Sequence, residues 1–110
     1  MYTPDKWVCL KMTQKSGEVL YKIFANWYGG YLNGDSWQLN SGVANVEIDG
    51  DIIKFHGYSG SVYACHKNCY GTSGYGAGIL GKLIGDIESV GVSVEIVPEQ
   101  TDWLNILKGF

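Results

Sequence analysis

The stretch that decides the fold is VANVEIDGDIIKFHGYSGSVYAC, residues 43–65. Near its middle, Asp49-Gly50 is typical of a two-residue hairpin turn, because a type I′ turn needs a positive φ that glycine adopts readily. Ser59-Gly60 is a second signal of the same kind. Closing the chain at both dipeptides predicts a three-stranded antiparallel meander in which alternate side chains share a face. Its apolar face would carry Ala44, Val46, Ile53, Phe55, Val62 and Ala64.

The predicted register pairs Val46 with Ile53 in the first hairpin and Phe55 with Ala64 in the second. The opposite face is polar and aromatic. It would carry Asn45, Glu47, Lys54, His56, Tyr58, Ser61, Tyr63 and Cys65. Two interpretations stay open for this face: a loop covers it, or it binds a ligand between the loops at residues 29–35 and 66–74.

Upstream of the meander, alternating patterns predict strands over residues 5–13, 18–28 and 36–40. The first of these strands is apolar on both faces, with Val8, Leu10 and Met12 on one side and Trp7 and Cys9 on the other. Downstream, apolar residues recur at helical spacing from Ile79 to Ile87, which predicts an amphipathic helix that begins near Ser73 or Tyr75 and ends at Gly91. A strand over residues 92–97 and a short helix over residues 101–107 complete the chain.

Together these elements predict one α+β domain over residues 1–110. We expect an antiparallel sheet of five to six strands, which includes the meander at 43–65 and the strand at 92–97. One glycine-rich amphipathic helix would pack against the apolar face of that sheet, and a short C-terminal helix would follow.

The predicted helix carries a row of glycines opposite its apolar stripe, namely Gly74, Gly78, Gly81 and Gly85. A smooth glycine face is typical of a helix that another backbone approaches closely, so we expect a homo-oligomer that uses this row. The alternative is that the helix simply tolerates these glycines. The run Gly76 to Gly81 also spells G-x-G-x-x-G, but no strand directly precedes it, which disfavours a dinucleotide fold. An anion near Thr72, Ser73 and Gly74 fits the helix N-terminus better.

Composition narrows the classes of function. The net charge of -3 disfavours a general nucleic-acid binder. No apolar run reaches membrane-spanning length, and the N-terminus lacks a signal-peptide pattern, so we expect a cytoplasmic protein that acts away from membranes.

Cys65, His66 and Cys69 offer metal ligands but lack a second cluster, so neither a metal nor a cofactor is expected. Because no catalytic motif is present, we expect a binding protein and not an enzyme.

The predicted ligand site combines aromatic walls with groups that would meet an anion. The walls would be Trp37, Tyr58, Tyr63 and Tyr70, and the anion would meet Lys54, His56, Ser61, His66, Lys67 and Ser73. Rings and cations in one pocket are the usual mix of a small-ligand site. These residues converge only if the loop after residue 65 folds back over the sheet.

Two segments carry a resemblance to a known group of proteins. WYGGYLNGDSWQLNSGV at 27–43 and FHGYSGSVYACHKNCYG at 55–71 resemble small accessory proteins of tailed bacteriophages. This resemblance implies a protein made in an infected bacterium, with a role in host takeover or in countering host defence. We therefore expect an oligomeric binding protein that sequesters a small anionic ligand, such as a nucleotide signal. The alternative is a protein–protein inhibitor of a host enzyme or defence factor, with exposed aromatic side chains as anchors and no small ligand.

Overall fold

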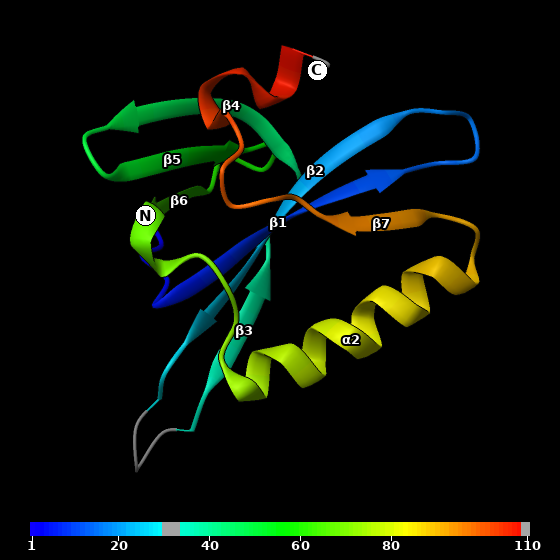
Figure 1. The fold of residues 1–110 in the computed structure, drawn as a ribbon, viewed down its shortest axis with the longest axis horizontal. Coiled ribbons are helices and arrows are strands. Elements are labelled where there is room, and N and C mark those ends of the chain that lie inside the picture. Colours follow the sequence, from blue (N-terminus) through cyan, green and yellow to red (C-terminus); the bar gives the residue numbers. More distant parts are fainter. Residues whose placement is uncertain (30–33, 109–110) are drawn as a thin grey trace.

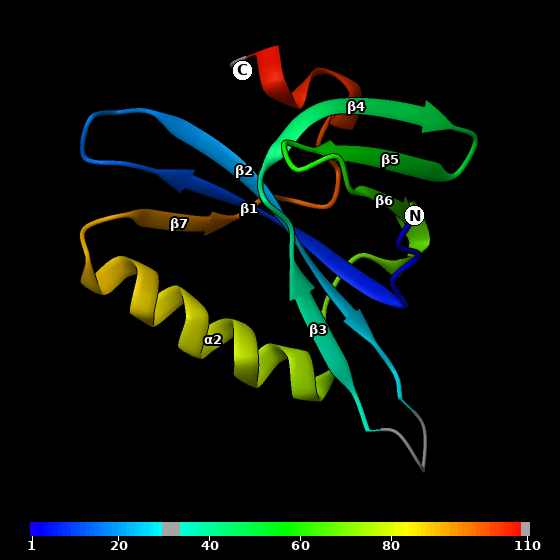
Figure 2. The same cartoon turned by 180° about the vertical axis from the view of Figure 1, so that it is seen from behind.

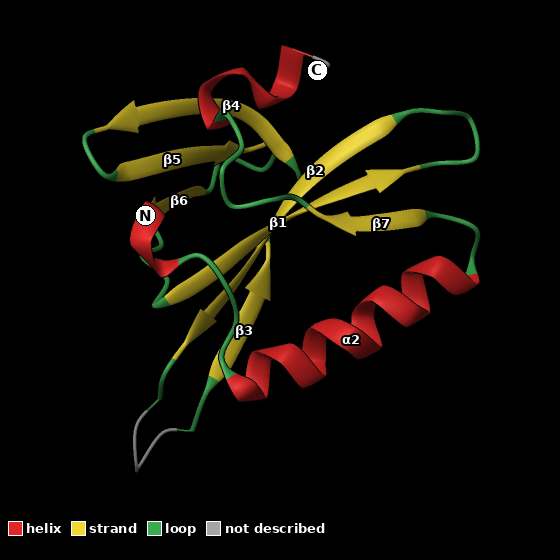
Figure 3. Cartoon of the chain, viewed as in Figure 1, coloured by secondary structure: helices red, strands yellow, loops and turns green. Residues whose placement is uncertain are grey.

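The computed structural model describes residues 1–29 and 34–108, and the chain folds as α+β (Figures 1 and 3). Residues 30–33 of the predicted loop at 29–35 lie outside the described residues. The strands are β1 (Lys6–Thr13), β2 (Val19–Trp27), β3 (Ser36–Leu39), β4 (Val43–Asp49), β5 (Ile52–Gly57), β6 (Val62–His66) and β7 (Ser93–Ile96). The helices are the 3-10 helix η1 (Lys67–Cys69), α2 (Gly74–Ser89) and the 3-10 helix η2 (Trp103–Lys108).

The strands form two antiparallel sheets, so the prediction of one sheet with five to six strands is wrong. The larger sheet has the order β3-β2-β1-β7, and the smaller has the order β4-β5-β6. The strand predicted at 92–97 does not join the meander, because β7 pairs with β1, where Leu10 lies opposite Ile96. The chain leaves the larger sheet after β3 and enters the smaller one at β4, which separates the meander from the other strands.

The larger sheet is the middle layer of three, as Figures 1 and 2 show from opposite sides. Helix α2 covers one face, where Leu80 packs with Val8 and Leu10. The meander covers part of the other face, where Phe55 packs in one cluster with Trp7. This arrangement confirms that the first strand is apolar on both faces. It also explains the second sheet, because a strand that is apolar on both faces needs a packing layer on each side.

The first hairpin of the meander keeps its predicted faces although its register differs. Val46 lies opposite Phe55, not Ile53, because the turn residues are Gly50 and Asp51, not Asp49 and Gly50. This shift moves every partner by two positions, so the same side chains stay inside. Ile53 and Phe55 are buried, as predicted.

One member of the predicted apolar face falls outside the core for a different reason. Ala44 is exposed because the pairing of β4 with β5 is irregular between Val43 and Asn45. Val43 is 1% exposed and takes the core position in its place. An extra residue in one strand of a pair re-aims the side chains beside it.

In the second hairpin the predicted faces are wrong for β6. The Gly57 amide donates to the Ser61 carbonyl at 2.8 Å, which leaves Tyr58, Ser59 and Gly60 as a three-residue loop. A three-residue loop shifts the register by one and reverses the two faces of the strand. Phe55 therefore lies opposite Tyr63. Tyr63 and Cys65 are buried in the core, and Val62 and Ala64 point to the side of His56 and Lys54.

Two of the three described helices, α2 and η2, form close to where the sequence predicts them, and η1 lies in the predicted loop at 66–74. Ser73 caps α2 through its Oγ, which accepts from the Gly76 amide at 2.9 Å. The helix is followed by Gly91 at φ +91, as expected for a C-terminal glycine. In η2, Trp103 and Ile106 are buried against the core that the meander shares with β1 and β2. Among the helices described, none is both long and apolar enough to cross a membrane.

Candidate functional site

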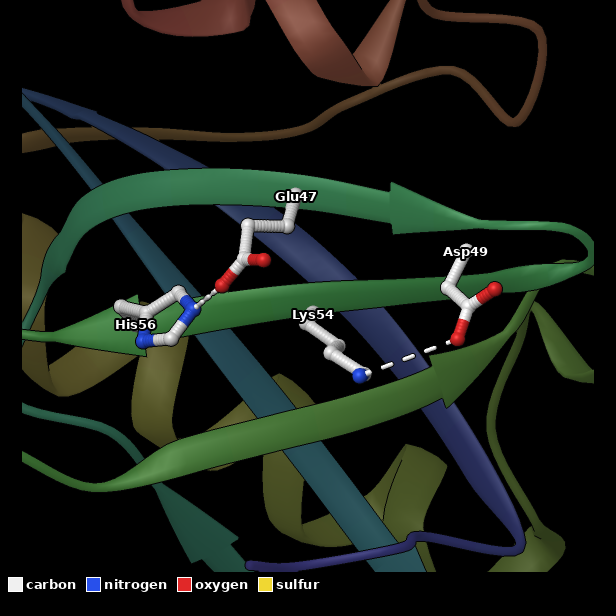
Figure 4. Close-up of polar contacts among 4 residues, drawn as sticks. All are labelled: Glu47, Asp49, Lys54 and His56. Atoms are coloured by element: carbon white, nitrogen blue, oxygen red, sulfur yellow. Dashed lines mark hydrogen bonds and ion pairs between the residues drawn. The ribbon is translucent and has the colours of Figure 1, made fainter.

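The outer face of the meander carries a histidine and a lysine that already have carboxylate partners. His56 Nε2 contacts Glu47 Oε1, and Lys54 Nζ lies 3.9 Å from Asp49 Oδ2; Figure 4 shows both pairs. At the end of the same sheet, Lys67 Nζ lies 3.5 Å from Asp51 Oδ1. Three side chains that were expected to meet an anion thus already contact carboxylates of the chain itself.

The predicted aromatic walls do not face one another. Tyr63 is 1% exposed and lies in the core. The hydroxyl of Tyr70 donates to the Val97 carbonyl and accepts from the Cys9 amide at 3.2 Å, and burial raises the pKa of Tyr70 to about 12. Trp37 stacks on Phe24 on the α2 side of the larger sheet, whereas Tyr58 lies in the loop between β5 and β6 of the meander.

The remaining predicted site residues form hydrogen bonds with the backbone of their own segments. The Ser61 carbonyl accepts from the Gly57 amide, and His66 Nδ1 accepts from the Asn68 amide at 3.1 Å. Ser73 is the helix cap described above. The loop after residue 65 does not fold back over the meander, because the Gly71 amide donates to the Trp7 carbonyl at 2.8 Å beside β1. The ten predicted residues therefore do not form one pocket.

The three thiols are free and lie in or against the core that the meander shares with β1 and β2. Cys9 and Cys65 are both buried, and burial raises the pKa of Cys9 to about 12 and also raises that of Cys65. Within residues 1–29 and 34–108, no three His, Cys, Asp or Glu side chains are grouped so that they could hold a metal ion.

The glycine row of α2 lies on an open surface of the chain. A Cβ placed at Gly74, Gly78, Gly81 or Gly85 would meet no heavy atom within 4 Å. All four residues are exposed. The row is therefore available to another molecule, and the homo-oligomer stays a prediction.

The structure instead shows a pocket on the uncovered part of the larger sheet, beside η2. It has a volume of about 420 Å³, within the range of small-ligand sites. Strands β1, β2 and β4 and helix η2 contribute its walls, and their arrangement can be followed in Figure 1. The lining residues are Lys11, Val19, Leu20, Tyr21, Val43, Ala44, Tyr58, Ile106 and Leu107.

Among the residues that the structure describes, Lys11 is the only charged one that lines this η2 pocket, which otherwise consists of apolar and aromatic side chains. Three ion pairs occur within the described part of the chain, and Lys11 belongs to none of them. Tyr21 and Tyr58 supply two aromatic rings. The η2 pocket thus combines one cation with apolar walls, which is the combination that the sequence analysis expected elsewhere.

A second cavity of about 370 Å³ adjoins the η2 pocket and shares Lys11, Tyr21 and Ile106 with it. Its other lining residues include the carboxylates Glu95 and Asp102. We call this second space the acidic cavity.

Of the residues that line the η2 pocket, the sequence pattern predicted Tyr58 but not Lys11, Tyr21 or the residues of η2. One signal was present, because Lys11 interrupts the face of the first strand that carries Trp7 and Cys9. A single charge on an otherwise apolar strand face marks the point where the core ends. The proximity of η2 could not be read from the pattern, because Lys11 and Ile106 lie far apart in the chain.

Comparison of the chain with protein-family models, with curated proteins and with solved structures found no match.

Proposed function

We propose that this chain is a binding protein that holds a small anionic ligand with an aromatic or apolar body in the η2 pocket. The observation that carries the proposal is Lys11, which has no ion-pair partner within residues 1–29 and 34–108 and lines a pocket whose other described lining residues are uncharged. The anionic group would lie at Lys11 Nζ, and the body of the ligand would pack between Tyr21 and Tyr58. A hydrogen bond to a charged group contributes about 1.5–3 kcal/mol, which suits such an anchor.

A role in infection is supported only by the resemblance to phage accessory proteins. In that setting the chain would withdraw a bacterial anionic metabolite or nucleotide signal from its receptor. Cyclic AMP is therefore a suitable probe beside simpler aromatic anions.

The test is calorimetry with indole-3-propionate, with the neutral indole-3-propanol as its uncharged match. We expect the acid to bind more tightly than the alcohol, and Lys11→Met to lower the affinity for the acid by about tenfold or more. Lys67→Met is the matched control, because Lys67 is already paired with Asp51, and it should leave the affinity unchanged. If both lysine variants bind the acid as the unaltered protein does, Lys11 is not the anchor and the proposal fails.

A protein–protein inhibitor is the second candidate, and exposed apolar side chains at the same place favour it. Val19, Tyr58 and Leu107 line the η2 pocket and are 42%, 66% and 41% exposed. A partner protein could insert a side chain there, since buried aromatic anchors dominate many interfaces. If neither indole-3-propionate nor cyclic AMP binds, while Tyr58→Ala abolishes activity in infected cells, this second function replaces the first.

A further inference from the structure

We infer that the ligand of the η2 pocket is a free α-amino acid with a large apolar or aromatic side chain. This inference rests on the proposed function and names its ligand class. It comes from the way in which the η2 pocket and the acidic cavity meet at Lys11.

Opposite charges stand side by side where the two spaces join. Lys11 and Glu95 are direct cross-strand partners in the pairing of β1 with β7, and both line the acidic cavity. Directly opposed residues in antiparallel strands have Cβ atoms about 4.5–5.5 Å apart. Nevertheless, the two side chains do not form an ion pair within 4.0 Å. Each charge is therefore free to meet a group of the ligand.

A ligand that satisfies both charges must carry its own opposite charges close together. The ammonium and carboxylate of an α-amino acid are attached to one carbon atom and meet this condition. The carboxylate would pair with Lys11, and the ammonium would pair with Glu95 on the side of the acidic cavity. A peptide terminus carries only one of the two charges and would leave either Lys11 or Glu95 without a partner.

The remaining walls determine the side chain of the amino acid. Away from Lys11, the η2 pocket is lined by apolar and aromatic residues, including Tyr21, Tyr58 and Leu107. A volume of about 420 Å³ admits a large side chain. Asp102, which also lines the acidic cavity, already accepts a hydrogen bond from Asn105 Nδ2 at 2.7 Å, so Glu95 is the principal partner for the ammonium.

Three matched probes separate the contributions of the two charges. L-Tryptophan carries both groups, indole-3-propionate lacks the ammonium, and tryptamine lacks the carboxylate. We expect the unaltered protein to bind L-tryptophan about tenfold more tightly than indole-3-propionate, and tryptamine more weakly than L-tryptophan.

The decisive variant is Glu95→Gln, with Glu88→Gln at the exposed end of α2 as its control. Glu95→Gln should remove the preference for L-tryptophan over indole-3-propionate, and it should strengthen binding of the acid because a repelling carboxylate is gone. Glu88→Gln should keep the preference. Circular dichroism would show that both variants remain folded.

The outcomes distinguish this inference from the function on which it rests. If indole-3-propionate binds through Lys11 but L-tryptophan binds no better, the amino acid is the wrong class and the proposed function stands. The amino acid is equally ruled out if Glu95→Gln and Glu88→Gln keep the preference to the same degree. If no probe binds, both proposals fall. If tryptamine binds as tightly as L-tryptophan, and does so in Lys11→Met as well, the carboxylates alone form the site and both proposals are overturned.

Discussion

Asn26 and Gly76 show how closely α2 approaches the larger sheet. Asn26 is 1% exposed, and its side-chain Oδ1 and Nδ2 find no hydrogen-bond partner in the described chain. A Cβ built on Gly76 would lie 2.2 Å from Asn26 Oδ1, a separation that atoms do not tolerate. Only glycine lets the first turn of the helix pass over this amide.

This contact predicts opposite effects for the same substitution at two positions of α2. Gly76→Ala should lower the free energy of unfolding by about 1–3 kcal/mol, because the clash outweighs the better helix propensity of alanine. Gly78→Ala should raise it by about 0.5–1 kcal/mol, because a Cβ there meets open space. Urea unfolding followed by tryptophan fluorescence measures both. Equal stability of the two variants would show that Asn26 does not lie under Gly76.

At the scale of the element, η2 packs against residues of both sheets. Trp103 is 7% exposed and packs edge-on against Trp7 and Phe55, with ring centroids 5.2 and 5.8 Å away. Those two partners come from different sheets, so a short helix near the C-terminus joins the two layers. The same helix supplies Ile106 and Leu107 to the η2 pocket.

Trp103→Ala should therefore lower the free energy of unfolding by about 3–5 kcal/mol, as expected for removing a large aromatic ring from a packed core. Leu104→Ala in the same helix is the control. Leu104 is 53% exposed, and its loss should change stability by about 0.5 kcal/mol or less. Chemical denaturation monitored by circular dichroism gives both values. A small loss for Trp103→Ala would mean that the two sheets are held together without η2.

At the scale of the whole molecule, buried tyrosine and cysteine side chains make the folded state less stable as the pH becomes alkaline. Burial raises the pKa of Tyr70 to about 12 and that of Cys9 to about 12, and it also raises the pKa values of Tyr63 and Cys65. Each group keeps its proton in the folded chain at pH values where the unfolded chain has lost it. Their contribution is thus fully present below pH 9 and is lost as pH rises through the folded values.

We therefore expect the melting temperature to fall between pH 9 and pH 12. Tyr70→Phe should make that fall shallower above pH 10, where the unfolded tyrosine would ionise. Tyr58→Phe is the control, because Tyr58 is 66% exposed, and it should follow the unaltered protein. Scanning calorimetry across this range tests the expectation, and identical curves for all three proteins would contradict it.

Assembly also belongs to the whole molecule, because the glycine row of α2 is open in a single chain. If this row is the interface of a homo-oligomer, light scattering at micromolar concentration should give a multiple of 12.1 kDa. Gly85→Leu should then lower the mass while the circular dichroism spectrum is kept. A protein that scatters as a monomer before any substitution would remove the interface.

By itself, the sequence determined most of the local structure. Alternating apolar residues predicted the strands, and the apolar residues on both faces of residues 5–13 marked the strand that became central. Ser73 and Gly91 marked the two ends of α2. These features depend on residues that are close in the chain, where turn geometry, capping and periodicity act directly.

Only the tertiary structure decided the rest. Ser59-Gly60 is compatible with a loop of two or three residues, and the three-residue loop placed Tyr63 inside, where it packs in the core with Phe55 and Trp7. The same holds for the candidate site. Lys11, Glu95 and Ile106 line one cavity because β7 pairs with β1 and η2 packs against the meander. Contacts between such distant residues follow from how whole layers pack, and no short sequence pattern encodes them.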